Sequence, residues 1–567
     1  MTIHGHTKSV AVKIIVVAFR PFRIPTSAKM PADEGVEVKQ SRLPGAGKGL
    51  FARAAFSPGD IVVSVDRPLV TELEVERMLD TCAWCCQRAA ADPIERKMAA
   101  AMGIPHGFTE VKSCTGCRRV AYCSRGCQTK AWKREHKYEC KVISIEDRPP
   151  LPPGVRAAIK ILGRLKADPD HAFADARKIM SLWPAGDPDG LAEISRLNQK
   201  KYEDFQVLGH AAWLYSGKPQ AEGLDLQTIS RKIVSNTMHN AIPLSSVFDG
   251  VPLGIAIDPL ISSANHSCDP NAVLVLNQPR HEMRALRKIK AGEEIFLSYI
   301  EATNPSHVRQ AQLKDSYLFT CKCATCQNGV NVKTDRFFGR FEDMGSEYRK
   351  IADKLVSRHE SKLSKFLGPG GDDEGAKRIA AIEAEAYDVL ETGQAGIDET
   401  REAIKLCVGS GLWSWTRQPV PLLCRQLATQ YLHASRVYEA FRIGVKLHCE
   451  ILPALYPQEF YTDRVLNAWS VSTLINVLCG DAHEELYQEL AKGGVQLRVL
   501  YFGFLFYLHE HTPRAFRPDS SFAKVTDHTY TQIMAGVTYS EEELKEKVQA
   551  AWPALEALAN NVTVSSF

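Results

Sequence analysis

The sequence predicts an α+β protein: a β-rich core that is interrupted by two inserts and followed by an all-helical C-terminal part. Short apolar runs bounded by glycine turns, as at Gly45–Gly49, are typical of strands. Eight cysteines from Cys82 to Cys140 indicate a metal-binding insert. Apolar residues recur at helical spacing from about residue 155 to 235 and again beyond residue 337.

Length and composition exclude several classes of protein. A chain of 567 residues is long enough for several domains of about 100 to 200 residues each. With 45% hydrophobic and 24% charged residues it is neither wholly disordered nor collagenous. The formal net charge of +4 is too small to imply a nucleic-acid or membrane partner for the whole molecule. The longest apolar run, Val499–Leu508, has about half of the roughly 20 residues that span a bilayer.

The segments follow one another in a definite order. Residues 1–35 are expected to be a poorly ordered extension, and Met30 is an alternative start of the functional chain. Strands are expected in residues 36–81 and again in residues 236–300, where Gly254–Ile257, Ala272–Leu276 and Glu294–Tyr299 alternate with turns. The other segments are the cysteine cluster at 82–140, a helical insert at 141–235, a cysteine-bearing tail at 301–330 and a helical C-terminal domain at 337–567.

Two helices of the C-terminal domain are expected to pack as a hairpin. The segment Leu423–Leu452 carries apolar residues at helical spacing on both sides of a short break. Helical hairpins in series are similar to tetratricopeptide repeats, although no clean 34-residue period is present. The tail aromatics, among them Trp413, Trp415 and Tyr501 to Tyr507, are interpreted as helix-packing core.

Cysteine spacing predicts structural zinc rather than disulfides. Paired cysteines in a long chain without a convincing signal peptide favour metal binding in a reducing cytosol or nucleus. Eight ligands fill two tetrahedral sites and leave no open position, and Cys86 is an alternative to Cys85 for one of them. A third complete set comes from more distant segments. The predicted ligands are Cys82, Cys85, Cys114, Cys117, Cys123, Cys127, His136 and Cys140, and then Cys268, Cys321, Cys323 and Cys326.

The spacing of the first eight ligands resembles the MYND zinc finger. This resemblance implies interleaved ligation, with Cys82, Cys85, Cys123 and Cys127 at one zinc and Cys114, Cys117, His136 and Cys140 at the other. The stretch between Cys85 and Cys114 is longer than usual and is interpreted as a surface insertion. Nine basic and only two acidic residues lie between Lys112 and Lys141, so a weak nucleic-acid contact is one expectation. Docking of a proline-rich peptide to the finger is a second expectation, which the resemblance implies.

Two further motifs carry a chemical signal. They are Asn265-His-Ser-Cys268 and Gly292-Glu-Glu-Ile-Phe-Leu-Ser-Tyr299, placed after the Gly45–Gly49 turn and before the Cys321–Cys326 tail. Together they resemble the SET-domain lysine methyltransferases, and with an inserted MYND finger and a helical C-terminal region they are similar to the SET and MYND domain (SMYD) family. The resemblance covers roughly residues 36 to 330.

The resemblance assigns roles to individual residues. It implies S-adenosylmethionine and three structural zinc ions as cofactors, with Tyr299 as the catalytic hydroxyl. Tyr317 and Met238 would border the lysine channel, and Met238 stands where the family usually has an aromatic residue. The residues implied in cofactor binding are Ala46, Gly47, Lys48, Asn236, Asn265, His266 and Phe319.

The expected function is methyl transfer to lysine side chains of histone or non-histone proteins by a monomer in the cytoplasm or nucleus. The first alternative is a non-catalytic adaptor, in which the finger and the helical tail bind partners and the SET core is a degenerate scaffold. The second is a DNA-binding regulator that uses the basic finger; a steep loss of affinity with added salt would characterise it.

Overall fold

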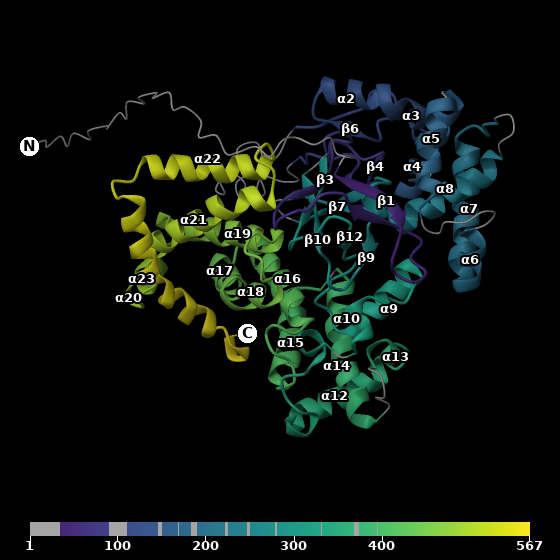
Figure 1. Cartoon of the computed structure of the whole chain (residues 1–567). Coiled ribbons are helices and arrows are strands. Elements are labelled where there is room, and N and C mark those ends of the chain that lie inside the picture. The colour runs from purple at the N-terminus through teal and green to yellow at the C-terminus, as the bar shows by residue number, and fades with distance from the viewer. Residues whose placement is uncertain are drawn as a thin grey trace, which may run out of the picture.

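The computed structural model describes most of the chain (Figure 1). The described residues are 35–89, 110–145, 150–167, 169–182, 190–220, 225–246, 250–277, 280–329, 331–367, 373–393 and 395–566. The expected N-terminal extension, most of the expected surface insertion after Cys85, and the Gly-rich segment near residue 370 lie outside these ranges. Within them, no helix is long and apolar enough to cross a membrane.

Strands from two distant parts of the chain share the β-rich core. A four-stranded sheet has the order β1-β2-β12-β9, and two three-stranded sheets have the orders β10-β11-β3 and β4-β8-β7. Both stretches predicted to be β-rich therefore contribute to each sheet, as expected for a core with inserts. The bounds are β1 Val36–Gln40, β2 Lys48–Ala52, β3 Ile61–Val65, β4 Val70–Leu73, β7 Ile242–Ser245, β8 Pro252–Ile257, β9 Asn265–His266, β10 Ala272–Asn277, β11 Arg280–Ala285 and β12 Glu294–Leu297.

The cysteine-rich segment folds into a small hairpin and a helical arm. Strands β5 (Lys112–Ser113) and β6 (Ala121–Tyr122) pair antiparallel. Helix α2 (Arg125–Ala131) starts at Ser124, whose hydroxyl accepts the Cys127 backbone N–H, and a π-helical turn then leads into α3 (Lys137–Ile143).

Five helices form the insert between the finger and the second part of the core. They are α4 (Pro153–Ala167), α5 (Pro169–Met180), α6 (Gly190–Leu197), α7 (Gln199–Tyr215) and α8 (Leu226–Asn240). Helix α8 starts at Asp225, whose carboxylate accepts two backbone N–H groups, and it ends at Asn240 rather than near residue 235. Asn236 and Met238 therefore lie on the last turn of a helix that joins the core at β7.

The C-terminal part is helical, as predicted, and surrounds one large apolar core (Figure 1). Helices α16 and α17 pack side by side, which confirms the predicted hairpin. Trp413 is buried in this core, while Trp415, Tyr501 and Tyr507 pack against it, as interpreted from the sequence. The bounds are α9 Ser306–Tyr317, α10 Ala324–Gln327, α11 Val332–Asp335, α12 Ser346–Arg358, α13 Leu363–Phe366, α14 Glu374–Glu391, α15 Ile397–Gly409, α16 Val420–His433, α17 Val437–Lys446, α18 Leu452–Leu455, α19 Thr462–Leu478, α20 Glu484–Lys492, α21 Leu497–Ala515, α22 Ser521–Ala535 and α23 Glu541–Asn560.

Buried charges attach the C-terminal helices to the core. Glu282 of β11 is fully buried and pairs with Arg284 on its own strand and with Arg517 beyond α21. Glu301, just after the core, accepts hydrogen bonds from the Tyr456 hydroxyl at 3.0 and 3.1 Å. Removing the Glu282 carboxylate would leave buried Arg284 without its counter-charge, and removing that of Glu301 would leave the buried Tyr456 hydroxyl without its acceptor, so these contacts help to fix how the helices cover the core.

Candidate functional site: three zinc groups and an aromatic cluster

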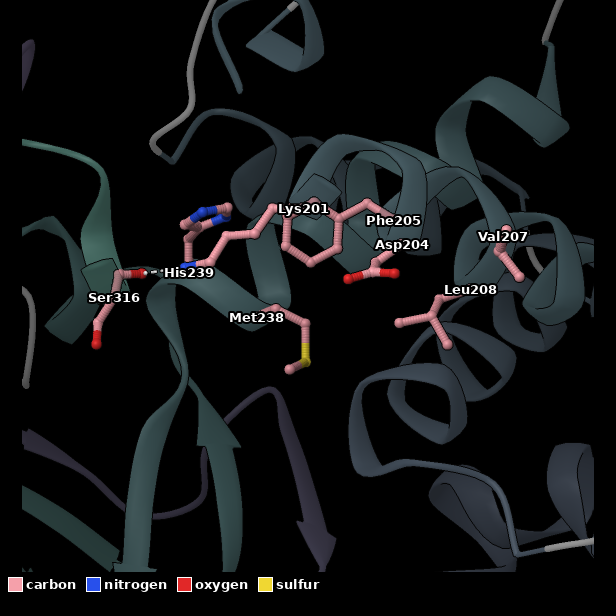
Figure 2. A pocket seen from close by; sticks show the side chains of 8 residues that line it. All are labelled: Lys201, Asp204, Phe205, Val207, Leu208, Met238, His239 and Ser316. Carbon is pink, nitrogen blue, oxygen red and sulfur yellow. Dashed lines mark hydrogen bonds between the residues drawn. The ribbon is translucent and has the colours of Figure 1, made fainter. Parts of the chain in front are cut away.

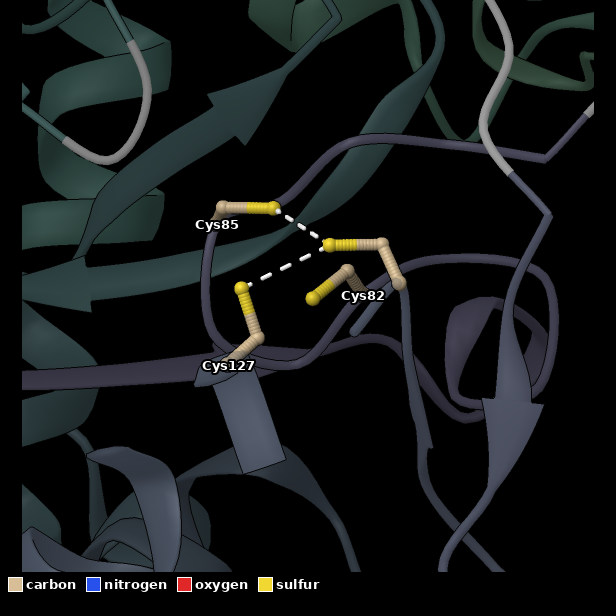
Figure 3. A group of neighbouring side chains, drawn as sticks. Cys82, Cys85 and Cys127 are labelled. Atoms are coloured by element: carbon tan, nitrogen blue, oxygen red, sulfur yellow. Dashed lines mark hydrogen bonds between the residues drawn. The ribbon is translucent and has the colours of Figure 1, made fainter. Parts of the chain in front are cut away.

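The predicted zinc ligands assemble into three separate groups. Within each group, the candidate ligand atoms all lie within 4.8 Å of one another. The first group joins Cys82 and Cys85 to Cys123 and Cys127, and Figure 3 shows Cys82, Cys85 and Cys127 pointing toward one another. The interleaving that the MYND resemblance implies is therefore present.

The donor chemistry of these groups fits zinc. Zinc–sulfur bonds of about 2.3 Å at tetrahedral angles place ligand sulfurs roughly 3.8 Å apart. The Cys123 sulfur lies 3.5 Å from that of Cys85 and 3.4 Å from that of Cys127. Cys86, the alternative to Cys85, is outside the group and has a left-handed backbone with φ 58°. The structure thus selects Cys85.

The second group is supported by a buried carboxylate. It comprises Cys114, Cys117, His136 and Cys140, all buried. His136 Nε2 faces the Cys114 and Cys117 sulfurs at 3.4 and 3.7 Å, while Nδ1 is 2.9 Å from Glu139 Oε1. A carboxylate on the far nitrogen of a ligand histidine fixes the tautomer and the orientation of the ring.

The Glu139 carboxylate belongs to a larger buried charge network. Lys160 Nζ on α4 lies 3.3 Å from Glu139 and 2.8 Å from Glu72 on β4, and Arg156 lies 3.7 Å from Glu72. All four side chains are almost fully buried. Burial would raise the pKa of Glu139, but Lys160 and His136 hold it at about 2. Lys160 thus joins the finger, the helical insert and the core at one point.

The third group lies next to the predicted catalytic segment. Cys268 comes from the loop after β9, and Cys321, Cys323 and Cys326 from the tail around α10. The Cys268 sulfur is 4.0 Å from that of Cys321 and 3.5 Å from that of Cys326. His266 Nε2 lies 3.3 Å from the Cys268 sulfur, so the metal group and the site share a direct contact.

Tyr299 and His266 lie together at the end of a parallel strand pair. Strand β9 runs beside β12, with Leu297 opposite His266. The Tyr299 backbone N–H donates to His266 Nδ1 at 3.1 Å, and the Tyr299 hydroxyl donates to the Ala264 carbonyl at 2.7 Å. Burial lowers the pKa of His266 to about 4 and raises that of Tyr299. The imidazole is therefore neutral and the phenol keeps its proton at neutral pH.

Two further aromatic residues complete this cluster. The Tyr317 ring is centred 5.0 Å from that of Tyr299, and its hydroxyl donates to the Tyr299 carbonyl at 3.2 Å. The Phe319 ring is centred 6.1 Å from that of His266. Between them Leu318 adopts the left-handed conformation that ends α9, with φ 61°. The turn brings both predicted aromatics to Tyr299 and His266.

The glycine turn approaches the same site through Asn265 and Glu294. The Asn265 amide N–H donates to the Lys48 carbonyl and to Glu294, each at 3.0 Å. Glu294 is buried and also accepts from Ser41 and from the Arg42 backbone. A Cβ at Gly49 would collide with the Glu294 carboxylate, so a larger residue there would displace Glu294 from its hydrogen bonds. Sequence reasoning assigned no role to Glu294, although the residue stands in the quoted Gly292–Tyr299 motif.

Two predicted site residues have other contacts. Asn236 is buried and donates to the Ile179 and Leu182 carbonyls at the end of α5, at 3.1 and 2.9 Å. No contact found among the described residues joins its side chain to His266 or Tyr299. Met238 is 46% exposed and lines a pocket with Ser316, the residue before Tyr317.

Comparisons with known proteins agree with this architecture. The SET domain model matches residues 47–300. The histone-lysine N-methyltransferase SMYD3 of Mus musculus is 28% identical over 303 residues, 52% of this chain and 62% of that protein. SMYD3 of Homo sapiens is 33% identical over 230 residues, 39% of this chain and 50% of that protein. The SET domain and MYND-type zinc finger protein 6 of Schizosaccharomyces pombe is 27% identical over 315 residues, 55% of this chain and 56% of that protein.

The match over residues 47–300 includes most strands of the β-rich core, so this part of the chain is similar to a SET domain. With two interleaved finger groups as well, the chain is similar to the SET and MYND domain (SMYD) proteins among these relatives, as its motifs predicted. The chain spans between half and just under two thirds of the length of the relatives named above.

Proposed function

We propose that this chain is an S-adenosylmethionine-dependent protein-lysine N-methyltransferase. The observation that carries the proposal is the Tyr299 hydroxyl, held 2.7 Å from the Ala264 carbonyl and beside a neutral His266. A fixed hydroxyl and a backbone carbonyl at one point can orient an amine for attack along a single line. The two SMYD3 relatives are named histone-lysine N-methyltransferases, which favours the same reaction.

The residues around the glycine turn suit the cofactor, which supplies an electrophilic methyl group when bound. Gly45 and Gly47 have positive φ angles, and a Cβ on either would meet no atom within 4 Å, so the backbone there is open to a ligand. Among the described residues, no hydrogen bond uses the Asn265 amide oxygen, which can therefore accept one from a ligand. We assign cofactor contacts to Ala46, Gly47, Lys48, Asn236, Asn265, His266 and Phe319.

The substrate lysine must lose its proton before it can attack. A channel bordered by Tyr299 and Tyr317 removes water from the ammonium group, which lowers its pKa and favours the neutral amine. The Tyr299 hydroxyl then orients the amine, because its proton is retained at neutral pH. Met238 at the channel edge differs in shape from the aromatic residue that is usual at this position in the family. We therefore expect it to influence the number of methyl groups added.

Replacing Tyr299 with phenylalanine tests the proposal. One preorganised hydrogen-bonding group is worth roughly 10²- to 10³-fold in rate, so transfer of radiolabelled methyl to core histones and lysate proteins should fall by that factor. Tyr539→Phe is the matched control, because Tyr539 is exposed and lies on a loop before α23. Equal transfer by the wild type and Tyr299→Phe would refute the role of Tyr299. Absence of both transfer and cofactor binding in the wild type would favour the adaptor.

We also propose a weak nucleic-acid contact at the finger. The two acidic residues between Arg118 and Lys141, Glu135 and Glu139, are buried and paired inside the fold, so the exposed charges of this stretch are cationic. Such a face attracts phosphates.

Trp132, which is 47% exposed on the same arm, offers an aromatic contact for the proline-rich peptide that the MYND resemblance implies.

The nucleic-acid contact has a definite salt signature. We expect affinity for a 20-base-pair DNA to fall with added salt, and the slope of log affinity against log salt to decrease by about 2 in the double variant Lys130→Glu/Lys133→Glu. Lys524→Glu on the exposed face of α22 is the control and should leave the slope unchanged. Fluorescence anisotropy measures both; an unchanged slope in the finger variant would contradict the contact.

The side chains of the three metal groups also indicate the cellular compartment that we propose. Twelve unoxidised ligand side chains in three metal groups suit the reducing cytoplasm or nucleus. We propose that the protein acts there as a monomer on protein substrates.

A further inference from the structure

A pocket of about 420 Å³ lies between residues of three helices (Figure 2). Helix α7 forms one wall, the last turn of α8 another, and the end of α9 closes it. Ser316 of this lining directly precedes Tyr317, whose hydroxyl donates to the Tyr299 carbonyl. The pocket and the proposed lysine channel are thus connected through two consecutive residues of α9, and Met238 is common to both. Its lining residues are Lys201, Asp204, Phe205, Val207, Leu208, Met238, His239 and Ser316.

The two charged residues of the pocket differ in what they already bind. The Lys201 ammonium group donates to the Asp315 and Ser316 carbonyls, so its charge caps the carboxyl end of α9. The Asp204 carboxylate is exposed, and among the described residues no basic group pairs with it. The charge that the pocket can offer to a ligand is thus negative.

The wall beside Asp204 is apolar and open to solvent. Val207 is 69% exposed and Met238 is 46% exposed, and both line the pocket together with Leu208. Exposed apolar side chains grouped in a concave surface bind an apolar group readily, because both surfaces leave water on contact. A methionine wall also adapts to side chains of different shape.

We propose that this pocket selects the substrate sequence: it takes an apolar side chain near the target lysine, and Asp204 pairs with an adjacent arginine or lysine of the same segment. The inference rests on the proposed function, because it treats the occupant as the methylated segment. Continuity with the Tyr317 channel argues for the substrate segment as the occupant, and the free carboxylate argues for its basic residue. Asp204, Val207 and Met238 are then specificity-determining residues.

Peptide binding tests this pocket without requiring catalysis. The probes are fluorescein-labelled peptides with a central lysine. Each peptide carries one Leu-Arg pair, and the set places this pair at every position within three residues of the lysine on either side. Matching peptides carry Ser-Arg or Leu-Glu in place of Leu-Arg. Anisotropy is measured on the full chain with S-adenosylhomocysteine present. We expect at least one register in which the Leu-Arg peptide binds about fivefold more tightly than either counterpart.

The variants separate the two parts of the pocket. Asp204→Lys should remove the preference for Arg over Glu, lowering affinity for the Leu-Arg peptide about five- to tenfold, whereas Val207→Asp should remove the preference for Leu over Ser. Glu203→Lys makes the same charge change on the neighbouring exposed residue of α7 and should retain both preferences. Methyl transfer to the best peptide should show the Asp204→Lys loss in KM rather than in kcat.

Each outcome decides one of the two proposals. Equal binding of all peptides by the wild type, or equal losses in Asp204→Lys and Glu203→Lys, overturns the pocket. Retained preferences without any methyl transfer leave the pocket intact and refute the methyltransferase proposal. Methyl transfer without any sequence preference overturns the pocket and leaves the methyltransferase proposal intact.

Discussion

Replacing Cys323 with serine is expected to remove one of three zinc ions and to abolish methyl transfer. Cys323 is buried in the third metal group, whose other members include Cys268. The Cys268 sulfur contacts His266, and His266 in turn accepts the Tyr299 backbone N–H. Structural zinc contributes on the order of 10 to 16 kcal/mol of binding free energy, so its loss should release the tail from the loop after β9.

Zinc content, cofactor binding and hydrogen exchange together check this prediction. The variant should retain two zinc ions per chain, bind no S-adenosylmethionine, and exchange amide hydrogens faster at residues 265–268 and 317–326. Cys479→Ser is the matched control, since Cys479 lies outside all three metal groups. A variant that keeps three zinc ions, or loses one and still methylates at the wild-type rate, would show that the third group does not support the site.

The sequence predicted the metal groups well because zinc imposes short, regular spacings on its ligands. Four pairs of donors within the segment from Cys82 to Cys140 could be recognised without knowledge of the fold. How the pairs interleave depends on the path of the chain, and that came from the family resemblance. The choice between Cys85 and Cys86 needed the backbone, because adjacent residues point in different directions.

The aromatic cluster around Tyr299 was predictable only in part. His266 and Tyr299 stand in two short motifs that could be recognised in the sequence, and the structure brings both residues together with Phe319. Strand β12 ends at Leu297, so Tyr299 lies beyond the strand predicted to include it, where its hydroxyl can turn to the Ala264 carbonyl. Glu294 escaped notice because its partners, Ser41 and Asn265, are distant in sequence and no local pattern links them.

Buried charge pairs between distant segments were beyond sequence reasoning for the same reason. In the sequence Lys160 is one of four basic residues of its helix, and Glu72 stands beside Thr71 in a short strand. Neither periodicity nor spacing indicates that both are buried against Glu139. This network has a large expected effect on stability.

Replacing Lys160 with methionine is expected to destabilise the junction of finger, insert and core by about 3 to 5 kcal/mol. Methionine keeps most of the side-chain length, so the loss is mainly one of charge. Glu72 and Glu139 would then face each other without the ammonium group that lies 2.8 and 3.3 Å away from them. Burial raises the pKa of Glu72 to about 7 even with Lys160 present, which shows how costly its charge is at this position.

Urea unfolding of the zinc-loaded protein and hydrogen exchange in α4 and β4 measure the effect. Lys166→Met, on the exposed end of the same helix, should change stability by less than about 0.5 kcal/mol. The double variant Lys160→Met/Glu72→Gln should recover part of the loss, because it removes one of the two carboxylates that lose the ammonium group. Because Glu139 orients the His136 ring, Lys160→Met should also release zinc from the second finger group at lower chelator concentration. Equal stability of the Lys160 and Lys166 variants would show that the buried carboxylates are neutral rather than held by Lys160.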